Sequence, residues 1–241
     1  LFSQYYQQFF DGADTAAWNS LLIELDPDTN NIWQVGPPSK VLFDSAFSTP
    51  NVIVTDTLNL YPAGNHSEFT FKIPVYPFST GILALQWMQK LDMEKGHSGG
   101  WVDFSVDNGL SWQSGFNNPY VYNYYGYDPS NVDTLTGGRQ VFTGLDSSWK
   151  NIWLCIDGNW LFGNDTMQVR FTFESDTLPE GGEGWMVDNL ITSFTFQHTL
   201  VEGPTKEKFK IYPTTTNGRV YIQAVKTDDF QIIETIDVID T

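Results

Sequence analysis

Residues 96–100 (GHSGG) hold the side-chain types of a nucleophilic site. They match the pattern G-x-S-x-G, in which the hydroxyl of Ser98 would attack a carbonyl carbon after a nearby base took its proton. That arrangement needs a strand before the serine and a helix after it. Here an alternating strand follows at residues 101–106, and a triad built on His66 would leave very little chain for the rest of a catalytic fold. We therefore interpret the segment as a glycine-rich connection between strands.

A second segment, residues 24–28 (ELDPD), suggests paired carboxylates for glycoside cleavage. It is similar to the E-x-D-x-x-E motif of laminarinase-type glucanases, but Thr29 stands where the second glutamate should be and Pro27 would interrupt a strand. The three histidines form no zinc-binding motif. Cys155, the only cysteine, lies in an apolar run at residues 152–156, where a buried thiol is expected. The sequence predicts no catalytic residue, and the protein is not expected to be an enzyme.

The composition predicts an all-β protein. Hydrophobic residues make up 41% and aromatic residues 16% of the chain, which excludes a disordered protein. Aromatic side chains pack well on pleated sheets, and the glycines and prolines fall in short clusters typical of turns. The net charge of −17 argues against nucleic acid and anionic membranes as partners, because basic side chains bind both. No apolar stretch is long enough for a transmembrane segment.

Alternation of apolar and polar residues with a period of two indicates strands. The predicted strands of the first domain cover residues 68–75, 81–88, 101–106, 167–174, 185–191 and 194–196. Residues 116–127 hold five tyrosines without a clean period, which predicts an irregular loop. After residue 198 the composition changes. We therefore expect a sandwich domain at 1–198, a polar linker at 199–208 and a small β unit at 209–241, with strands at 209–213, 218–223 and 232–239.

Residues 105–112 (SVDNGLSW) match the pattern S-x-D-x-G-x-S/T-W. In a hairpin, Asp107 can accept hydrogen bonds from amides of its own turn, and Gly109 can adopt a positive φ. Trp112 can then pack back onto the strand. The motif repeats around the propellers of sialidases but occurs once here, so we predict a structural role for it.

The order of several features resembles the MAM-like domains of immune-inhibitor-A-type secreted peptidases and of bacterial surface proteins. The resemblance covers roughly residues 80–196 and rests on Glu94, the hairpin at 105–112, Trp149, and the segments 169–176 (VRFTFESD) and 184–190 (GWMVDNL). It implies a jelly-roll or concanavalin-like β-sandwich.

The same resemblance implies a calcium site, because members of the family often bind Ca²⁺ through carboxylates and carbonyl oxygens. The candidate ligands are Glu94, Asp176, Asp188 and, more loosely, Asp11. This sequence departs from the family at Ser98, where an aspartate is usual.

Residues 209–222 (FKIYPTTTNGRVYI) resemble the opening of the Ig-like C-terminal sorting domain of proteins exported by the type IX secretion system of Bacteroidetes. The match rests on Tyr212, Pro213, Asn217 and Gly218. The family's last strand would follow Thr241, so we expect an incomplete sorting unit, and a chain that starts at Leu1 is expected to lack an N-terminal segment. The implied partners are the type IX translocon and its outer-membrane shuttle and attachment proteins. The implied location is secreted or on the outer-membrane cell surface.

These observations predict a non-catalytic binding or adhesion module with a protein or glycan ligand. Two alternatives stay open: an accessory domain of a larger secreted peptidase or hydrolase, and a lectin-like carbohydrate-binding module. For the second alternative the candidate binding residues are the tyrosines of 116–127, whose rings could stack on sugars: Tyr120, Tyr122, Tyr124, Tyr125 and Tyr127.

Overall fold

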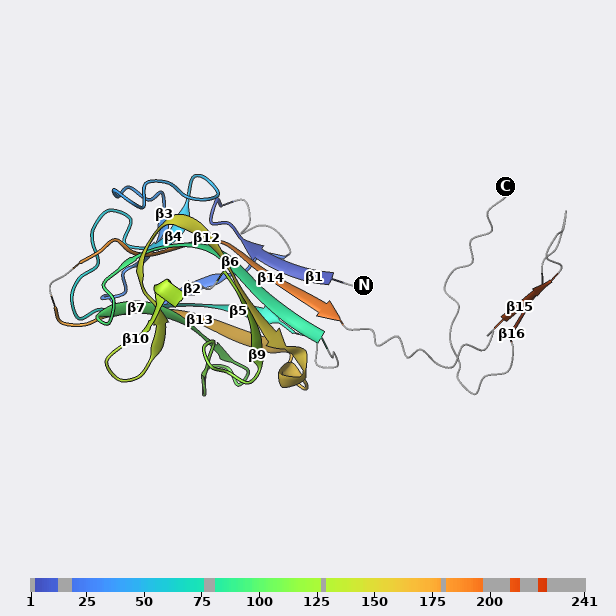
Figure 1. The fold of residues 1–241 in the computed structure, drawn as a ribbon. Helices are drawn as coiled ribbons and strands as arrows, with labels where there is room; N and C mark the ends of the chain where they lie inside the picture. The colour runs from blue at the N-terminus through green and yellow to red at the C-terminus, as the bar shows by residue number, and fades with distance from the viewer. Residues whose placement is uncertain are drawn as a thin grey trace. The chain divides into compact units, whose positions relative to one another are not determined.

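The computed structural model describes residues 3–12, 19–75, 81–126, 129–178, 181–196, 209–212 and 221–224. The chain divides into two compact units, Leu1–Gln197 and His198–Thr241. The first unit is a two-layered β structure, shown in Figure 1. Among the described residues, no helix has the length and apolar character needed to span a bilayer.

One layer of the first unit is a seven-stranded antiparallel sheet. Its strands are β1 (Ser3–Gln8), β3 (Trp33–Gly36), β4 (Val52–Thr55), β6 (Gly81–Met93), β9 (Val121–Tyr125), β12 (Gly144–Asp157) and β14 (Gly184–Phe196). They lie in the order β3-β4-β14-β6-β12-β9, and β1 also pairs with β14.

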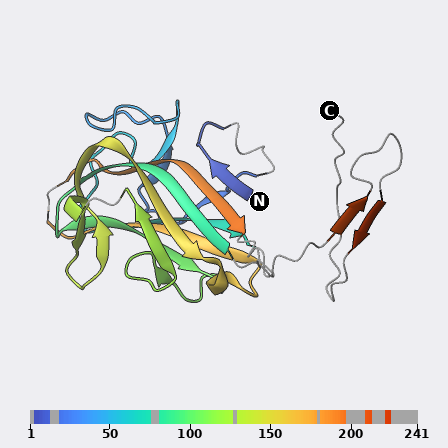
Figure 2. The same cartoon turned by 45° about the vertical axis from the view of Figure 1, so that its right-hand side comes forward.

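The other layer is a second seven-stranded antiparallel sheet, which faces the first in Figure 2. Its strands are β2 (Ile23–Leu25), β5 (His66–Pro74), β7 (Ser98–Ser105), β8 (Gln113–Ser114), β10 (Val132–Thr134), β11 (Gln140–Phe142) and β13 (Thr166–Ser175). They lie in the order β10-β11-β7-β13-β5-β2, and β8 pairs with β7. Two short 3-10 helices, η2 (Pro129–Asn131) and η3 (Gly158–Leu161), lie in the connections. The predicted all-β sandwich of the jelly-roll class is confirmed.

The second unit contains an antiparallel hairpin of β15 (Phe209–Tyr212) and β16 (Tyr221–Ala224). Strand β15 lies within the predicted strand 209–213, and β16 overlaps the predicted strand 218–223 but ends one residue beyond it. The third predicted strand of this unit, residues 232–239, lies outside the described residues.

Alternation places one face of each central strand in the core. In β5, Phe69, Phe71 and Ile73 are buried, while the positions that alternate with them, Thr70 and Lys72, are polar. In β13, Val169 and Phe171 are buried in the same way, and Phe171 lies opposite Phe69 in the register of the two strands. Both strands agree with the predicted alternation, and Pro74 ends β5 as expected of a residue without an amide hydrogen.

Aromatic rings from four strands meet at Phe171. The ring of Phe69 stacks on it with centroids 4.8 Å apart. From the opposite sheet, Trp87 approaches edge-on at 5.2 Å and Trp185 at 5.4 Å. Such aromatic pairs contribute about 0.5–1.5 kcal/mol each beyond the apolar area they bury. The two sheets are therefore joined by specific ring packing at this point.

The hairpin at 105–112 has the predicted structural role. Asp107 accepts hydrogen bonds from the amide of Ser111 at 2.9 Å and from its hydroxyl at 2.5 Å. These bonds, the hydroxyl bond first, lower the pKa of Asp107 to about 2. Gly109 has φ +83°, and Trp112 packs under the guanidinium of Arg170 at 4.2 Å.

The prediction of an irregular loop at 116–127 is wrong for residues 121–125, which form β9. This strand pairs with β12, with Tyr124 opposite Leu154 and Tyr125 opposite Trp153. It lies at the edge of its sheet. Its order comes from this one long-range pairing, which the local residue pattern does not show.

Gly100 allows the two sheets to approach each other. A Cβ atom at this position would overlap the ring of Trp185, which is fully buried. Only glycine can occupy this position of β7 without moving the indole.

Replacing Gly100 by alanine is expected to lower the free energy of unfolding by about 1–3 kcal/mol, the usual cost of overpacking a core. Gly36→Ala is the matched control, because its new Cβ would meet only Cγ2 of Thr57 at an ordinary 3.5 Å. Urea unfolding of both variants measures the difference. Equal losses would contradict the role assigned to Gly100.

Candidate functional site

The residues of the G-x-S-x-G match have structural partners. Ser98 begins β7, and its buried hydroxyl lies 2.8 Å from the hydroxyl of Tyr61. The same hydroxyl accepts a hydrogen bond from the amide of Glu94 at 2.9 Å. Nδ1 of His97 lies 2.7 Å from a carboxylate oxygen of Asp176. This arrangement agrees with a connection between strands, and the predicted burial of Cys155 is confirmed.

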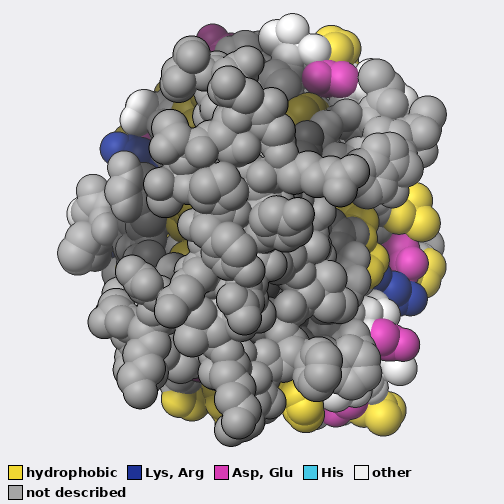
Figure 3. Space-filling model, turned by 90° about the vertical axis from the view of Figure 1, so that its right-hand side faces the viewer, with side chains coloured by type: hydrophobic (Ala, Val, Ile, Leu, Met, Phe, Trp, Pro, Cys, Tyr) yellow, Lys and Arg dark blue, Asp and Glu magenta, His cyan; other side chains and the backbone are white. Residues whose placement is uncertain are grey.

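The visible acidic side chains on one face of the molecule do not form a single cluster. Figure 3 shows Asp and Glu at separate places around the visible rim. Within the described ranges, no group of three or more His, Cys, Asp or Glu side chains is placed to hold a metal ion. A calcium site here would have to take most of its ligands from carbonyl, amide or hydroxyl oxygens, which Ca²⁺ accepts.

Asp188 is a fully buried carboxylate in β14. It accepts hydrogen bonds from the amide and hydroxyl of Ser48 at 2.8 and 2.9 Å and from the amide of Asn189 at 2.7 Å. No described Lys, Arg or His forms an ion pair with it. Burial raises the pKa of Asp188 to about 6. A bound cation would offset the cost of this buried charge.

The residue that follows Asp188 in sequence carries an orphaned acceptor. Oδ1 of Asn189 is buried and has no hydrogen-bond partner among the described residues. Asn189 has φ +49° and sits in a bulge of β14 between Asp188 and Ile191. Buried polar atoms without partners are rare in native proteins and call for an explanation such as an ion.

Asp11 is brought to the same region by the segment before β4. Its carboxylate accepts a hydrogen bond from the amide of Asn51 at 3.3 Å. The side chain of Asn51 also bonds the carbonyl of Phe10 at 3.1 Å, and Ser48 bonds the carbonyl of Phe9 at 3.2 Å. Carboxylate, hydroxyl and carbonyl oxygens therefore gather around residues 48–51. This all-oxygen set fits a hard cation such as Ca²⁺.

The chain that leads to this segment is fixed by Glu183. Its buried carboxylate accepts hydrogen bonds from the amides of Val41, Leu42 and Phe43 at 2.6–3.0 Å. Nζ of Lys40 donates to the carbonyl of Glu183 at 2.6 Å, and burial lowers the pKa of this lysine to about 8. The backbone before residues 48–51 is thereby held in place.

Glu94 and Asp176 form a separate group at the turn between β6 and β7. The carbonyl of Glu94 accepts hydrogen bonds from the amides of His97 and Ser98 at 3.2 and 2.9 Å. The side chain of Glu94 is exposed. The hydrogen bond from His97 holds the pKa of Asp176 below its usual range. Within the described residues, no hydrogen bond or ion pair joins this group to Asp188 or Asp11.

The segment 114–121, which leads from β8 to β9, is anchored in the core. The amide of Gly115 donates to the carbonyl of Val102 in β7 at 2.8 Å. Phe116 is buried, with its ring 5.1 Å from that of Phe142. These two contacts attach the start of the segment to the second sheet.

Asn118 fixes the rest of the segment. Its side-chain amide donates to the carbonyl of Ser114 at 2.8 Å, and its side-chain oxygen accepts the amide of Tyr120 at 2.9 Å. The preceding residue, Asn117, has φ +50°, a conformation that non-glycine residues rarely adopt. Such backbone persists where the surroundings determine it, and it concentrates at functional sites.

Tyr120 and Trp160 form a stacked aromatic pair at the end of this segment. Their ring centroids are 5.4 Å apart and the planes differ by 13°. Trp160, in η3, packs against the hydrophobic core, whereas Tyr120 is 40% exposed. Phe162 follows η3 and is 64% exposed. The Tyr120–Trp160 pair, called the aromatic platform below, thus presents the ring of Tyr120 to solvent.

The other predicted tyrosines have different placements. Tyr122, Tyr124 and Tyr125 lie in β9, and their side chains are not described. Tyr127 lies outside the described residues.

Beside the start of segment 114–121 lies a surface depression of about 330 Å³. It is lined by Ser114, Phe116, Asn117, Gly137, Gly138, Arg139 and Gln140. The side-chain nitrogen of Asn117 donates a hydrogen bond to Oε1 of Gln140 at 2.6 Å. The side-chain oxygen of Asn117 and the side-chain nitrogen of Gln140 are then left to bind hydroxyl groups of a ligand. We call this hollow the Arg139 depression.

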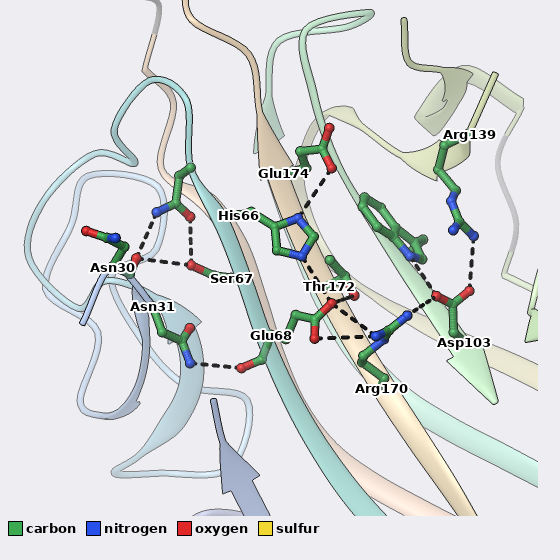
Figure 4. Close-up of polar contacts among 12 residues, drawn as sticks. Asn30, Asn31, His66, Ser67, Glu68, Asp103, Arg139, Arg170, Thr172 and Glu174 are labelled. Carbon is green, nitrogen blue, oxygen red and sulfur yellow. Dashed lines mark hydrogen bonds and ion pairs between the residues drawn. The ribbon is translucent and has the colours of Figure 1, made fainter. Parts of the chain in front are cut away.

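Arg139 belongs to a network across the outer face of the second sheet, drawn in Figure 4. Nη1 of Arg139 donates to Asp103 at 3.1 Å, and its guanidinium lies 4.9 Å from the ring of Trp101. Asp103 also accepts from Arg170 at 3.1 Å, and Arg170 lies 3.4 Å from Glu68. Alternating charges therefore link β7, β13 and β5.

His66 ends this network between two carboxylates, at 3.1 Å from Glu68 and 3.4 Å from Glu174 (Figure 4). The hydrogen bond with Glu68 comes first among the causes that raise the pKa of His66. Burial acts to raise the pKa of Glu68, but His66 and Arg170 outweigh it and hold that pKa below its usual value. The imidazole is therefore stabilised in its charged form.

The sequence does not identify three residues of this region as candidates for the site. Trp160 and Arg139 lie in no motif, and Asn117 has no signal beyond its place in a tyrosine-rich stretch. Trp160 reaches Tyr120 because the amide of Asp157 bonds the carbonyl of Tyr120 at 2.8 Å. This contact joins residues far apart in sequence.

Of the predicted sorting residues, Tyr212 ends β15, where it pairs with Tyr221. Pro213, Asn217 and Gly218 lie outside the described residues.

No protein-family model matches the chain, and no curated protein matches its sequence. Several solved structures are similar to it. The K1 cleaved adhesin domain of Lys-gingipain from Porphyromonas gingivalis W83 has a TM-score of 0.41 and 11% identity, covering 80% of this chain and 99% of that one. TmCBM27, a carbohydrate-binding module described with specific mannan recognition, has a TM-score of 0.37 and 11% identity, covering 81% of this chain and 99% of that one. TmCBM61 in complex with β-1,4-galactotriose has a TM-score of 0.37 and 12% identity, covering 74% of this chain and 91% of that one. At these TM-scores and identities the likenesses carry no information about the ligand of this chain.

Proposed function

We propose that this chain is a non-catalytic extracellular binding module that recognises carbohydrate on the aromatic platform. The observation that carries the proposal is the stacked pair Tyr120 and Trp160, in which one ring is held by the core and the other is open to solvent. A flat ring fixed in this way offers an apolar surface to the C–H face of a sugar at low entropic cost.

Polar groups beside the platform support the same ligand class. Asn117 and Gln140 present amide groups at the Arg139 depression, which begins at the other end of the same short segment. Ligand sites typically combine apolar contact with a few fixed polar groups that orient the ligand. Sugars need both, because their rings have apolar faces and hydroxyl edges.

The test is a glycan array probed with the 241-residue chain in the presence of calcium, followed by calorimetric titration of the best glycan. We expect saturable binding to one glycan class. Tyr120→Ala should weaken it about tenfold, which corresponds to a loss of about 1.4 kcal/mol of contact. Tyr120→Phe, which keeps the ring, should bind like the unmodified chain.

Leu110→Ala, at an exposed position of the hairpin 105–112, is the control for surface changes elsewhere. A blank array would contradict carbohydrate recognition and favour a protein ligand. Undiminished glycan binding by Tyr120→Ala would contradict binding on the aromatic platform.

We further propose that Ca²⁺ stabilises the module at Asp188 and Asp11. The buried unpaired carboxylate of Asp188, the orphaned oxygen of Asn189 and the oxygens around residues 48–51 support this. A bound ion would balance the buried charge and link the residues that follow β1, the segment before β4, and β14. Glu94 and Asp176 have no part in this proposal.

Melting in calcium and then in chelator tests the calcium proposal. Calcium should raise the melting temperature, because an ion bound only by the folded state stabilises it by mass action. Asp188→Asn should lose most of this rise, because the charged carboxylate that would hold the ion is removed. Asp165→Asn, at an exposed position, should keep the full rise. No calcium effect on the unmodified chain would contradict the site.

The sequence resemblance at residues 209–222 supports a third proposal, export through the type IX secretion system to the cell surface or medium. The hairpin of β15 and β16 gives this tail a β conformation of its own. The tail clusters as a compact unit of its own, which is what a detachable sorting element requires.

Expression of the chain behind a secretory signal peptide, in a type IX-competent bacterium and in a translocon-deleted strain, tests export. We expect the protein outside the cell only when the translocon is present. A Pro213→Ala, Gly218→Ala double variant should reduce export in the competent strain. Equal amounts outside both strains, or none outside either, would contradict the proposal.

A further inference from the structure

The guanidinium of Arg139 is fixed in place and still has donors to spare. One nitrogen, Nη1, donates to Asp103 at 3.1 Å, and the group stacks 4.9 Å from the ring of Trp101. A guanidinium carries five N–H donors. Among the described residues, no other hydrogen bond or ion pair is made by the side chain of Arg139, which is 42% exposed beside the depression.

Asp103 does not neutralise Arg139 fully. It is 1% exposed and accepts hydrogen bonds from the indole of Trp101 at 3.0 Å and from Arg170 at 3.1 Å, so one carboxylate is shared by two arginines. Arg170 has a further carboxylate partner in Glu68, whereas Arg139 has no second carboxylate partner among the described residues. Positive charge therefore remains available at Arg139.

The Arg139 depression lies close to the aromatic platform. Asn117 lines the depression and Tyr120 belongs to the platform, and three residues of chain span at most about 10 Å. Both ends of this short connection are anchored, by Phe116 and Asn118 respectively. One oligosaccharide could therefore contact both places.

We propose that the Arg139 depression is a subsite for a carboxylate-bearing sugar, such as a uronic acid, in a glycan whose neighbouring sugar stacks on Tyr120. The unused N–H donors of Arg139 match a carboxylate, which a planar guanidinium can bind in bidentate fashion. The amides of Asn117 and Gln140 take the hydroxyl groups of the same ring. This inference rests on the proposed function, since it names the acidic sugar that the carbohydrate site selects.

The charge of the chain narrows the ligand further. A net charge of −17 repels densely charged anionic polymers. A ligand with a single carboxylate can form an ion pair with Arg139. It brings no further negative charge that the acidic protein would repel. The preferred ligand is therefore a mostly neutral glycan with isolated uronic acid residues.

Calorimetric titration of the 241-residue chain tests the inference with two probes. One is a neutral oligosaccharide that carries a single glucuronic acid, and the other is the same oligosaccharide with that carboxyl reduced to an alcohol. We expect the acidic probe to bind about tenfold tighter or better, as a charge-assisted pair provides. Arg139→Gln should bind both probes equally, and Lys72→Gln, which alters an exposed lysine on β5, should keep the preference.

Arg139→Lys is the control in case Arg139→Gln does not fold, because lysine keeps a positive charge opposite Asp103. A lysine cannot bind a carboxylate in bidentate fashion. We expect it to keep only part of the preference. In the unmodified chain, the indole N–H resonance of Trp101 should also shift with the acidic probe and not with the reduced one.

The outcomes separate the two proposals. Equal binding of both probes by the unmodified chain, or a preference that survives Arg139→Gln in a protein of native melting temperature, overturns the uronate subsite alone. Absence of binding to either probe, together with a blank glycan array, overturns the carbohydrate function and the subsite with it.

Discussion

The packing of aromatic rings around Phe171 is the interaction on which the rest of the structure depends. Phe69, Trp87 and Trp185 surround this ring and join the two sheets. The cluster continues through Phe142, whose ring lies 6.0 Å from Trp87 and 5.8 Å from Trp185. Close approach of Trp185 to β7 in turn requires glycine at position 100.

The same cluster positions the candidate binding surface. Phe116 packs on Phe142, so the segment that carries Asn117 and Tyr120 starts from the core itself. Asn118 and the underlying Trp160 then fix the far end of that segment. A surface fixed in this way loses little conformational entropy when a ligand binds, which is the physical basis of preorganised recognition.

The sequence predicts those parts of the fold whose signals are local. The alternation in β5 and β13, the turn at Asp107 and the end of β5 at Pro74 all follow from neighbouring residues. Strand β9 could not be predicted, because it is an edge strand ordered by a partner far along the chain. The candidate site depends on the same kind of information. Tyr120 can be singled out as a candidate from its tyrosine-rich stretch, but its meeting with Trp160 follows from the pairing of β9 with β12.

Arg139 shows the same limit in electrostatic terms. Its importance comes from the buried Asp103 that it shares with Arg170, and both partners come from other strands. The carboxylates predicted from motif order likewise separate into two groups, and only Asp188 and Asp11 are drawn to one oxygen-rich segment. Motif order identifies residue types, whereas strand register decides which of them meet.

Recognition of carbohydrate on the aromatic platform can be tested by a crystal structure of the chain with the oligosaccharide selected on the array. We expect a sugar ring lying against the exposed face of Tyr120, with the next sugar directed toward Arg139. A sugar bound elsewhere, for example on the outer sheet face beside His66 and Glu68, would contradict it.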